Sequence, residues 1–157
     1  MVAQWSSGGY PFGDLLALAR QSWVGELTRR LAASGYPGYR RSDSAALRLL
    51  RSGPVPVGRL GAGLGVTRQA ARKVAEALVQ RGYAGLSRDE RDSRQLNVAL
   101  TAAGQDYVRA ITATIDELNR EVRSRADPAA LAAADTVLRA ALFDDGARRR
   151  AARLPPP

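Results

Sequence analysis

The chain has 157 residues, enough for one ordinary domain, or a small domain with helical extensions, and for a hydrophobic core. Its 24 basic and 15 acidic side chains leave a net charge of +9, which favours a polyanionic partner such as DNA, RNA or an acidic membrane surface. Cysteine and histidine are both missing, which excludes disulfides, Cys/His metal sites and Ser-His or Cys-His catalysis. We therefore expect no enzyme, no metal site and no cofactor.

The beginning of the chain resembles neither a secretory signal nor a membrane anchor. Residues 1–13 lack a basic start and a continuous apolar region, and no apolar run in the sequence approaches the ~18 residues of a membrane span. We expect an irregular segment over 1–13, no membrane partner and a cytoplasmic location.

The first two expected helices are separated by the segment SGYPGY at 34–39. Asp14 is expected to cap a helix over 14–34, and Ser42 or Asp43 a second helix that ends at 52–54. Apolar residues recur at three- and four-residue steps along the first helix, as on one helical face: Leu16, Ala19, Trp23, Leu27 and Leu31.

The segment VPVGRLGAGLGV at 55–66 predicts a third, weaker helix. Val57, Leu60 and Leu64 share one helical face, but each interior glycine costs about 1 kcal/mol relative to alanine. The run GAGLG at 61–65 does not indicate a dinucleotide site, because its spacing is GxGxG rather than GxGxxG and no strand is expected before it.

Thr67 begins a fourth helix with one apolar face and one polar, largely basic face, and Gly82 follows its end. The apolar face carries Ala71, Val74, Ala75 and Leu78, and the polar face carries Arg68, Gln69, Arg72, Lys73 and Glu76. Two helices joined by a glycine-containing turn, the second with a basic outer face, are typical of a helix-turn-helix.

Residues 83–87 and 95–100 are expected to pair as a two-stranded hairpin, with the charged turn 88–94 between them. Placed directly after a helix-turn-helix, such a hairpin is a wing. Its charged tip favours contact with a nucleic-acid backbone.

Two more helices are expected after Thr101, one ending before Asp127-Pro128 and one after it, and then a flexible basic tail over 144–157. The long helix has an apolar stripe formed by Tyr107, Ile111, Ile115, Leu118 and Val122, and the last one carries Leu131, Ala134, Leu138 and Leu142. These stripes could pack within one subunit, but a small winged domain offers them little partner surface. We therefore expect an intersubunit bundle and a homodimer.

Residues 60–104 resemble the MarR family of winged-helix transcriptional regulators. The likeness lies in a helix ending in Leu-Gly-Val, the Thr-Arg-Gln start of the next helix, its Arg-Gly end, an Asp-x-Arg wing and a Leu-Thr...Gly motif. It implies a mainly α fold (an α+β winged helix) in which a helix-turn-helix with a two-stranded β wing, at 40–101, is flanked by N- and C-terminal dimerisation helices at 14–34 and 102–143.

The resemblance also assigns roles to residues. Thr67 to Lys73 would face the major groove, Arg94 would enter the minor groove, and Asp92 would orient its guanidinium. The expected double-stranded DNA contacts are Thr67, Arg68, Gln69, Arg72, Lys73, Arg88, Arg91, Asp92 and Arg94. The alternative for the helix residues is a solvated face, and for Arg94 a pairing with Asp92 or Asp89 alone.

The resemblance implies that the chain is a ligand-responsive repressor that binds a pseudo-palindromic operator as a homodimer. Family members bind small effectors in a crevice beside the dimerisation helices, so Trp23 and Tyr39 are the effector candidates, although core packing is an alternative for such aromatic residues. A rival is an architectural or antagonist protein that dimerises with another winged-helix regulator without reading a sequence itself.

Overall fold

A computed structural model describes residues 11–88 and 95–152. The chain divides into two compact units, residues 1–115 and 116–157, and the long helix α5 (Ala102–Arg125) crosses from one unit into the other. The wing turn 89–94 lies outside the described residues, and with it Arg91, Asp92 and Arg94.

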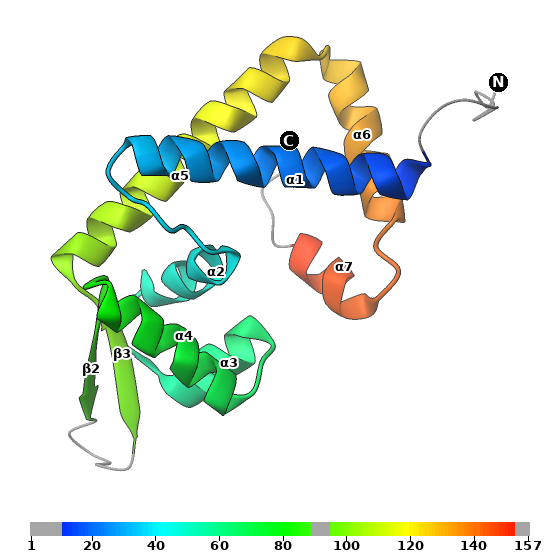
Figure 1. Ribbon diagram of the computed structural model, residues 1–157. Coiled ribbons are helices and arrows are strands. Elements are labelled where there is room, and N and C mark those ends of the chain that lie inside the picture. The colour runs from blue at the N-terminus through cyan, green and yellow to red at the C-terminus, as the bar shows by residue number, and fades with distance from the viewer. Residues whose placement is uncertain (1–10, 89–94, 153–157) are drawn as a thin grey trace. The chain divides into compact units, whose positions relative to one another are not determined.

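The first unit holds a helix-turn-helix and a small antiparallel sheet (Figure 1). Its elements are α1 (Phe12–Ala33), α2 (Arg41–Leu50), β1 (Val55–Pro56), α3 (Val57–Leu64), α4 (Arg68–Gln80), β2 (Ala84–Arg88), β3 (Leu96–Leu100) and the first part of α5. A mainly helical fold with a β wing was expected, and the structure confirms it.

The sheet has three strands in the order β1-β3-β2, one more than the expected hairpin. The added strand is β1, in which Val55 pairs with Val98 and Pro56 with Asn97 of β3. Helical periodicity had assigned these residues to the third helix. Proline has no N–H and is tolerated on an edge strand, so a two-residue strand can end directly at the start of α3.

Two of the expected helix caps differ in the structure, and one is confirmed. Pro11, not Asp14, precedes α1 as its N-cap, and Asp14 lies in the first turn, where its charge favours the helix dipole. Asp43 lies inside α2 and accepts a hydrogen bond from Arg40 N (3.1 Å). Thr67 caps α4 as expected, because its Oγ1 accepts a bond from Ala70 N (3.2 Å).

A single core joins the helix-turn-helix to the sheet. It is formed by buried side chains from the apolar faces of α2, α3, α4 and β3, most of which the helical spacing predicted. They are Ala46, Leu47, Leu50, Val57, Leu60, Ala71, Ala75, Leu78 and Val98.

The glycines of α3 allow close packing, although they lower its helix propensity. A Cβ on Gly61 would lie 3.1 Å from Val66 O and 3.4 Å from Ala71 Cβ, and one on Gly63 would lie 2.7 Å from the Leu49 side chain. Gly65 ends α3 with a φ of 68°, a left-handed conformation that suits glycine. Gly61 therefore lets α3 approach the start of α4, Gly63 lets it approach α2, and Gly65 sets the turn between α3 and α4.

The second unit contains the end of α5, α6 (Pro128–Ala140) and α7 (Asp145–Ala151). The break at Asp127-Pro128 was predicted, and Asp127 in addition caps α6 by accepting a hydrogen bond from Ala130 N (2.8 Å). The expectation of a flexible tail from residue 144 is wrong for 145–151, because Asp144 Oδ1 caps α7 through Ala147 N (2.7 Å). Among the described helices, none is long and apolar enough to cross a membrane.

Candidate nucleic-acid interface

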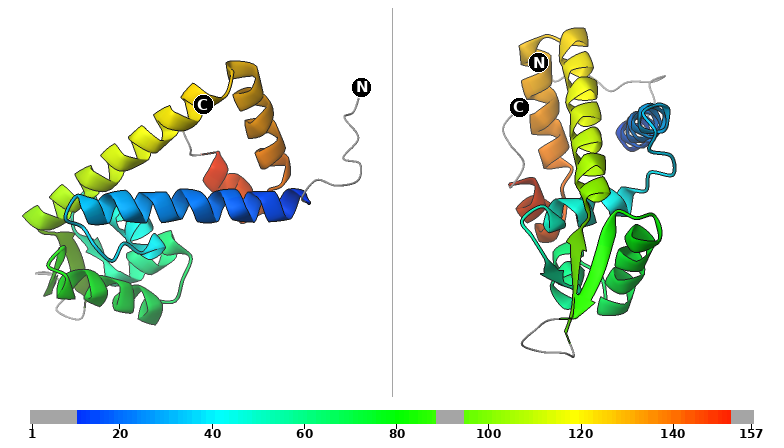
Figure 2. Two further views of the ribbon diagram at one scale, coloured as in Figure 1. Left: turned by 45° about the horizontal axis from the view of Figure 1, so that its top comes forward. Right: turned by 90° about the vertical axis from the view of Figure 1, so that its left-hand side faces the viewer.

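The outer face of α4 is an exposed, basic surface. Arg68, Gln69, Arg72 and Lys73 are all exposed, whereas Ala71, Ala75 and Leu78 on the opposite face are fully buried. The core contacts of one face thus orient the other toward solvent. The views in Figure 2 show α4 beside α3 at the edge of the winged domain. The first turn of α4 contains no acidic residue, so its amide dipoles add to the positive potential.

Two neighbours on this face are paired. Arg72 Nε donates to Glu76 Oε1 at 2.8 Å across one helical turn. The Arg72 side chain is largely exposed (62%), and that of Glu76 is half-buried (43% exposed). This pairing of Glu76 was not among the predictions, although the four-residue spacing between Arg72 and Glu76 is the sequence signal for such a pair.

Of the four wing residues expected to contact DNA, only Arg88 lies within the described residues. Arg88 is exposed at the end of β2 and pairs in register with Leu96 of β3. Contacts of Arg91, Asp92 and Arg94 stay predictions, because these residues fall in the range 89–94.

The two effector candidates lie apart in the sequence and are both half-buried. Trp23 is in α1, and Tyr39 is in the loop before α2. The Tyr39 hydroxyl forms a hydrogen bond with Ser44 Oγ (2.7 Å), so its polar end already has a partner. The assignment of these two residues to an effector stays a prediction.

A buried ion pair fixes the C-terminal end of α4. Arg81, the C-cap of α4, donates from Nη1 to Asp43 Oδ2 (2.9 Å) and from Nη2 to Asp43 Oδ1 (3.0 Å). Its remaining bonds go to Ala77 O (3.1 Å) and Gly38 O (3.3 Å). The hydrogen bonds to Asp43 raise the pKa of the Arg81 guanidinium. The pair thus ties α4 to the start of α2. It could not be predicted from the sequence, because Asp43 and Arg81 share no local pattern.

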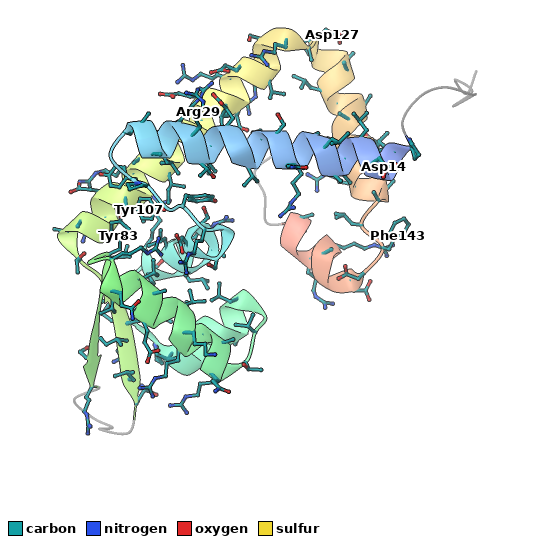
Figure 3. All side chains as sticks on the ribbon, in the orientation of Figure 1. Asp14, Arg29, Tyr83, Tyr107, Asp127 and Phe143 are labelled. Carbon is teal, nitrogen blue, oxygen red and sulfur yellow. The ribbon has the colours of Figure 1, made fainter. Side chains whose placement is uncertain are left out.

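A stack of tyrosine rings continues this contact toward α5. Tyr83 and Tyr107 stack with ring centroids 4.3 Å apart (Figure 3). Tyr36 also stacks with Tyr107, with ring centroids 5.2 Å apart. The guanidinium of Arg81 lies 5.4 Å from the Tyr83 ring centroid. The cation–π contact and the stacked tyrosine rings therefore link the end of α4 to α5 and to the loop between α1 and α2.

The residues at the start of α5 are hydrogen-bonded to the residues that follow α4. Thr101 Oγ1 donates to Gly82 O (2.6 Å) and accepts from Gly104 N (3.0 Å), while Thr101 N donates to Tyr83 O (3.2 Å). A Cβ on Gly104 would overlap the carbonyl oxygen of Tyr83, so only glycine fits there. This explains the Leu-Thr...Gly motif: it fastens α5 to the residues that follow α4.

The described residues show no arrangement for metal chemistry. No group of three or more Asp and Glu side chains within 11–88 and 95–152 could hold a metal ion. The dominant feature of the site is instead the positive, exposed face of α4.

The fold is similar to that of solved transcriptional regulators. A probable transcriptional regulator from Pseudomonas aeruginosa is 25% identical, with a TM-score of 0.65 and coverage of 82% of this chain and 95% of that chain. A mutant MarR from E. coli, solved with operator DNA, is 19% identical, with a TM-score of 0.66 and coverage of 85% and 94%. BpsR from Bordetella bronchiseptica, whose DNA binding is regulated by 6-hydroxynicotinic acid, is 24% identical, with a TM-score of 0.64 and coverage of 88% and 100%.

No family model matches the sequence, and neither does any curated protein. The structural likeness extends over most of the chain and includes the winged helix as well as the flanking helices. This chain therefore has the winged-helix fold of the MarR-type transcriptional regulators, as the resemblance in residues 60–104 implied.

Proposed function

We propose that this chain is a DNA-binding transcriptional regulator that reads a specific duplex sequence with α4. The observation that carries the proposal is the exposed row of Arg68, Gln69, Arg72 and Lys73 on the second helix of a helix-turn-helix. Arginine and glutamine can pair with guanine and adenine edges in the major groove, and arginine and lysine also bind phosphates.

The wing adds a second contact in this proposal. Arg88 at the end of β2 binds phosphate, and Arg91 and Arg94, with Asp92 orienting the latter, reach the backbone and the minor groove. Phosphate contacts of this kind supply much of the affinity and make it depend on salt, whereas α4 supplies the sequence preference.

The chain acts as a homodimer in this proposal. Support comes from apolar side chains that are exposed in each unit: Leu15 (52%) and Leu18 (50%) in α1, and Val137 and Leu138 (44% each) in α6. No residue of α6 is buried within the chain. Exposed apolar stripes on long helices are typical of surfaces that a second copy covers.

A twofold dimer presents two copies of α4 to one face of the duplex. Its operator is then a pseudo-palindrome with half-sites about 10 bp apart. Bound over a promoter, such a dimer represses transcription, and a small molecule that changes the separation of the two α4 helices releases it. The regulated DNA binding of BpsR supports this ligand response by analogy.

Selection of bound duplexes from fragments of the source genome tests the proposal. We expect one enriched pseudo-palindromic sequence, two chains per duplex, and competition by random DNA only in large excess at physiological salt. Equal binding to all duplexes, or no binding, would contradict it. Sequence-independent binding, or dimerisation only with another winged-helix regulator, would instead support an architectural or antagonist protein.

The effector proposal needs a separate measurement. Trp5 and Trp23 are the two tryptophans, so Trp5→Phe leaves Trp23 as the only indole reporter. An effector that contacts Trp23 and Tyr39 should change the Trp23 fluorescence at concentrations that also release DNA. Release without a fluorescence change would place the effector elsewhere.

A further inference from the structure

The acidic residue Glu76 lies within the basic row of α4. Arg68, Arg72 and Glu76 follow one another at four-residue intervals and therefore lie along one line on the helix surface. Glu76 is the sole carboxylate in the α4 sequence RQAARKVAEALVQ. A helix selected only for attraction to phosphate would not carry a negative charge there, because the grooves of DNA have a negative potential.

The contact with Arg72 gives this charge a defined geometry. Arg72 Nε donates to Glu76 Oε1 at 2.8 Å. Within the described residues, no hydrogen bond engages Nη1 or Nη2 of Arg72. A guanidinium held through Nε keeps its two Nη groups for another acceptor, and this fork can pair with O6 and N7 of guanine.

The same carboxylate acts against the wrong contacts. A phosphate that approached Arg72 on nonspecific DNA would meet the negative charge of Glu76 at close range. The guanine edge is uncharged and suffers much less from that repulsion. An unfavourable element aimed at the competing partner raises specificity even where it lowers total affinity.

We propose that Glu76 is a specificity-determining positioning residue: its carboxylate orients Arg72 for guanine and repels phosphate from the same guanidinium. The inference rests on the proposed function, since it assigns Glu76 a part in sequence reading by α4. It also distinguishes Arg72 from Arg68 and Lys73, for which no side-chain hydrogen bond is found in the described residues.

The test compares binding to the selected operator and to random duplex for the parent, Glu76→Ala, Arg72→Ala and the double variant. We expect Glu76→Ala to strengthen binding to random DNA and to lower the operator preference about tenfold, the value of one good bidentate base contact. In the Arg72→Ala background, Glu76→Ala should leave the preference unchanged, because Glu76 acts through Arg72.

A matched control removes a similar ion pair outside α4. Arg139 Nε donates to Asp135 Oδ2 (2.6 Å), again across four residues of a helix. Asp135→Ala should leave the operator preference unchanged. A conservative variant, Glu76→Gln, keeps an acceptor for Arg72 Nε and should lose less of the preference than Glu76→Ala.

Three results would overturn the proposal. The first is an operator preference that Glu76→Ala leaves unchanged, and the second is a larger loss of preference in Glu76→Gln than in Glu76→Ala. The third is a loss of preference on Glu76→Ala that is the same whether residue 72 is arginine or alanine. This third result would mean that Glu76 contacts a base itself, such as N4 of cytosine. If the parent protein selects no sequence at all, the proposed function fails; if the parent discriminates and Glu76→Ala does too, only the role of Glu76 fails.

Discussion

Arg81 and Asp43 form a two-bond ion pair between helices α4 and α2, with N–O distances of 2.9 and 3.0 Å. The Asp43 side chain is only 2% exposed, and that of Arg81 is 24% exposed. Because the partners lie 38 residues apart, the pair joins the end of the proposed recognition helix to the first helix of the winged domain.

Removal of Arg81 should destabilise the protein strongly. Arg81→Ala leaves the buried Asp43 carboxylate without its cation, and we expect the free energy of unfolding to fall by about 3 kcal/mol, at the low end for broken buried pairs because Arg81 is partly exposed. Urea unfolding followed by circular dichroism measures the change. Arg109→Ala, which breaks an exposed pair with Asp106, is the control and should cost less than about 1 kcal/mol. Equal costs for both variants would contradict the role of burial.

Two glycines should respond to alanine with opposite signs. Gly104→Ala places a Cβ against Tyr83 O, so it should shift the start of α5 and lower the free energy of unfolding by about 2 kcal/mol or more. Gly25, inside α1, has nothing within 4 Å of its Cβ position. Gly25→Ala should therefore raise the free energy of unfolding by about 0.5–1 kcal/mol, because alanine has the higher helix propensity. Thermal unfolding of both variants tests the pair, and a neutral Gly104→Ala would contradict the close approach.

The buried hydroxyl of Tyr107 gives a prediction with a pH dependence. Its oxygen is buried with no hydrogen-bond partner among the described residues, so Tyr107→Phe should raise the free energy of unfolding by about 1 kcal/mol at pH 7. Burial raises the pKa of the Tyr107 phenol above its ordinary value of 10.0.

The sign of the pH effect follows from that raised pKa. Above pH 10 the unfolded chain releases the phenolic proton while the folded chain retains it, so the parent loses stability as the pH rises through that range. The free energy of unfolding of Tyr107→Phe should fall less over the same pH interval. Urea unfolding at several alkaline pH values measures this, and an equal fall with pH in the two proteins would contradict the prediction.

The two proposed DNA contacts should differ in kind. Arg72→Ala should lower the ratio of operator to random binding, because α4 reads bases, whereas Arg94→Ala should weaken binding to both and reduce the salt slope by about 1. Fluorescence anisotropy at several salt concentrations measures both effects. Arg20→Ala, on exposed α1 surface, serves as the control. Parental behaviour in both DNA variants would make the site assignment wrong.

A charge on α6 should separate the proposed dimer. Leu138 is 44% exposed in the single chain, so Leu138→Glu costs little within the chain but places a charge in an apolar interface. Analytical ultracentrifugation should show a dimer for the parent and a monomer for the variant, with circular dichroism unchanged. Arg123→Glu near the end of α5, a polar exchange at an exposed position, is the control. A dimeric Leu138→Glu protein would place the interface elsewhere.

Much of the fold could be predicted from local patterns in the sequence. Three- and four-residue spacing identified the buried faces of α2 and α4, and Thr67, Gly82 and Asp127-Pro128 marked helix ends that the structure confirms. In α1 the same spacing was right for Leu27 and Leu31, which are buried, but wrong for Leu16 and Ala19, which are exposed. These signals depend on residues within one or two turns, where capping and helical periodicity act. The same reasoning identified the basic face of α4 as the candidate site.

Contacts between distant residues were decided only by the tertiary structure. Strand β1 forms because β3 offers Val55 a partner, the Arg81–Asp43 pair forms because α4 ends beside the start of α2, and Gly104 is needed because Tyr83 O approaches it. None of these leaves a periodic or local signature. The sequence by itself thus determined the helices, their buried faces and the positive charge of α4, whereas tertiary packing determined which residues hold that helix in place, because such contacts depend on distances that only the folded chain creates.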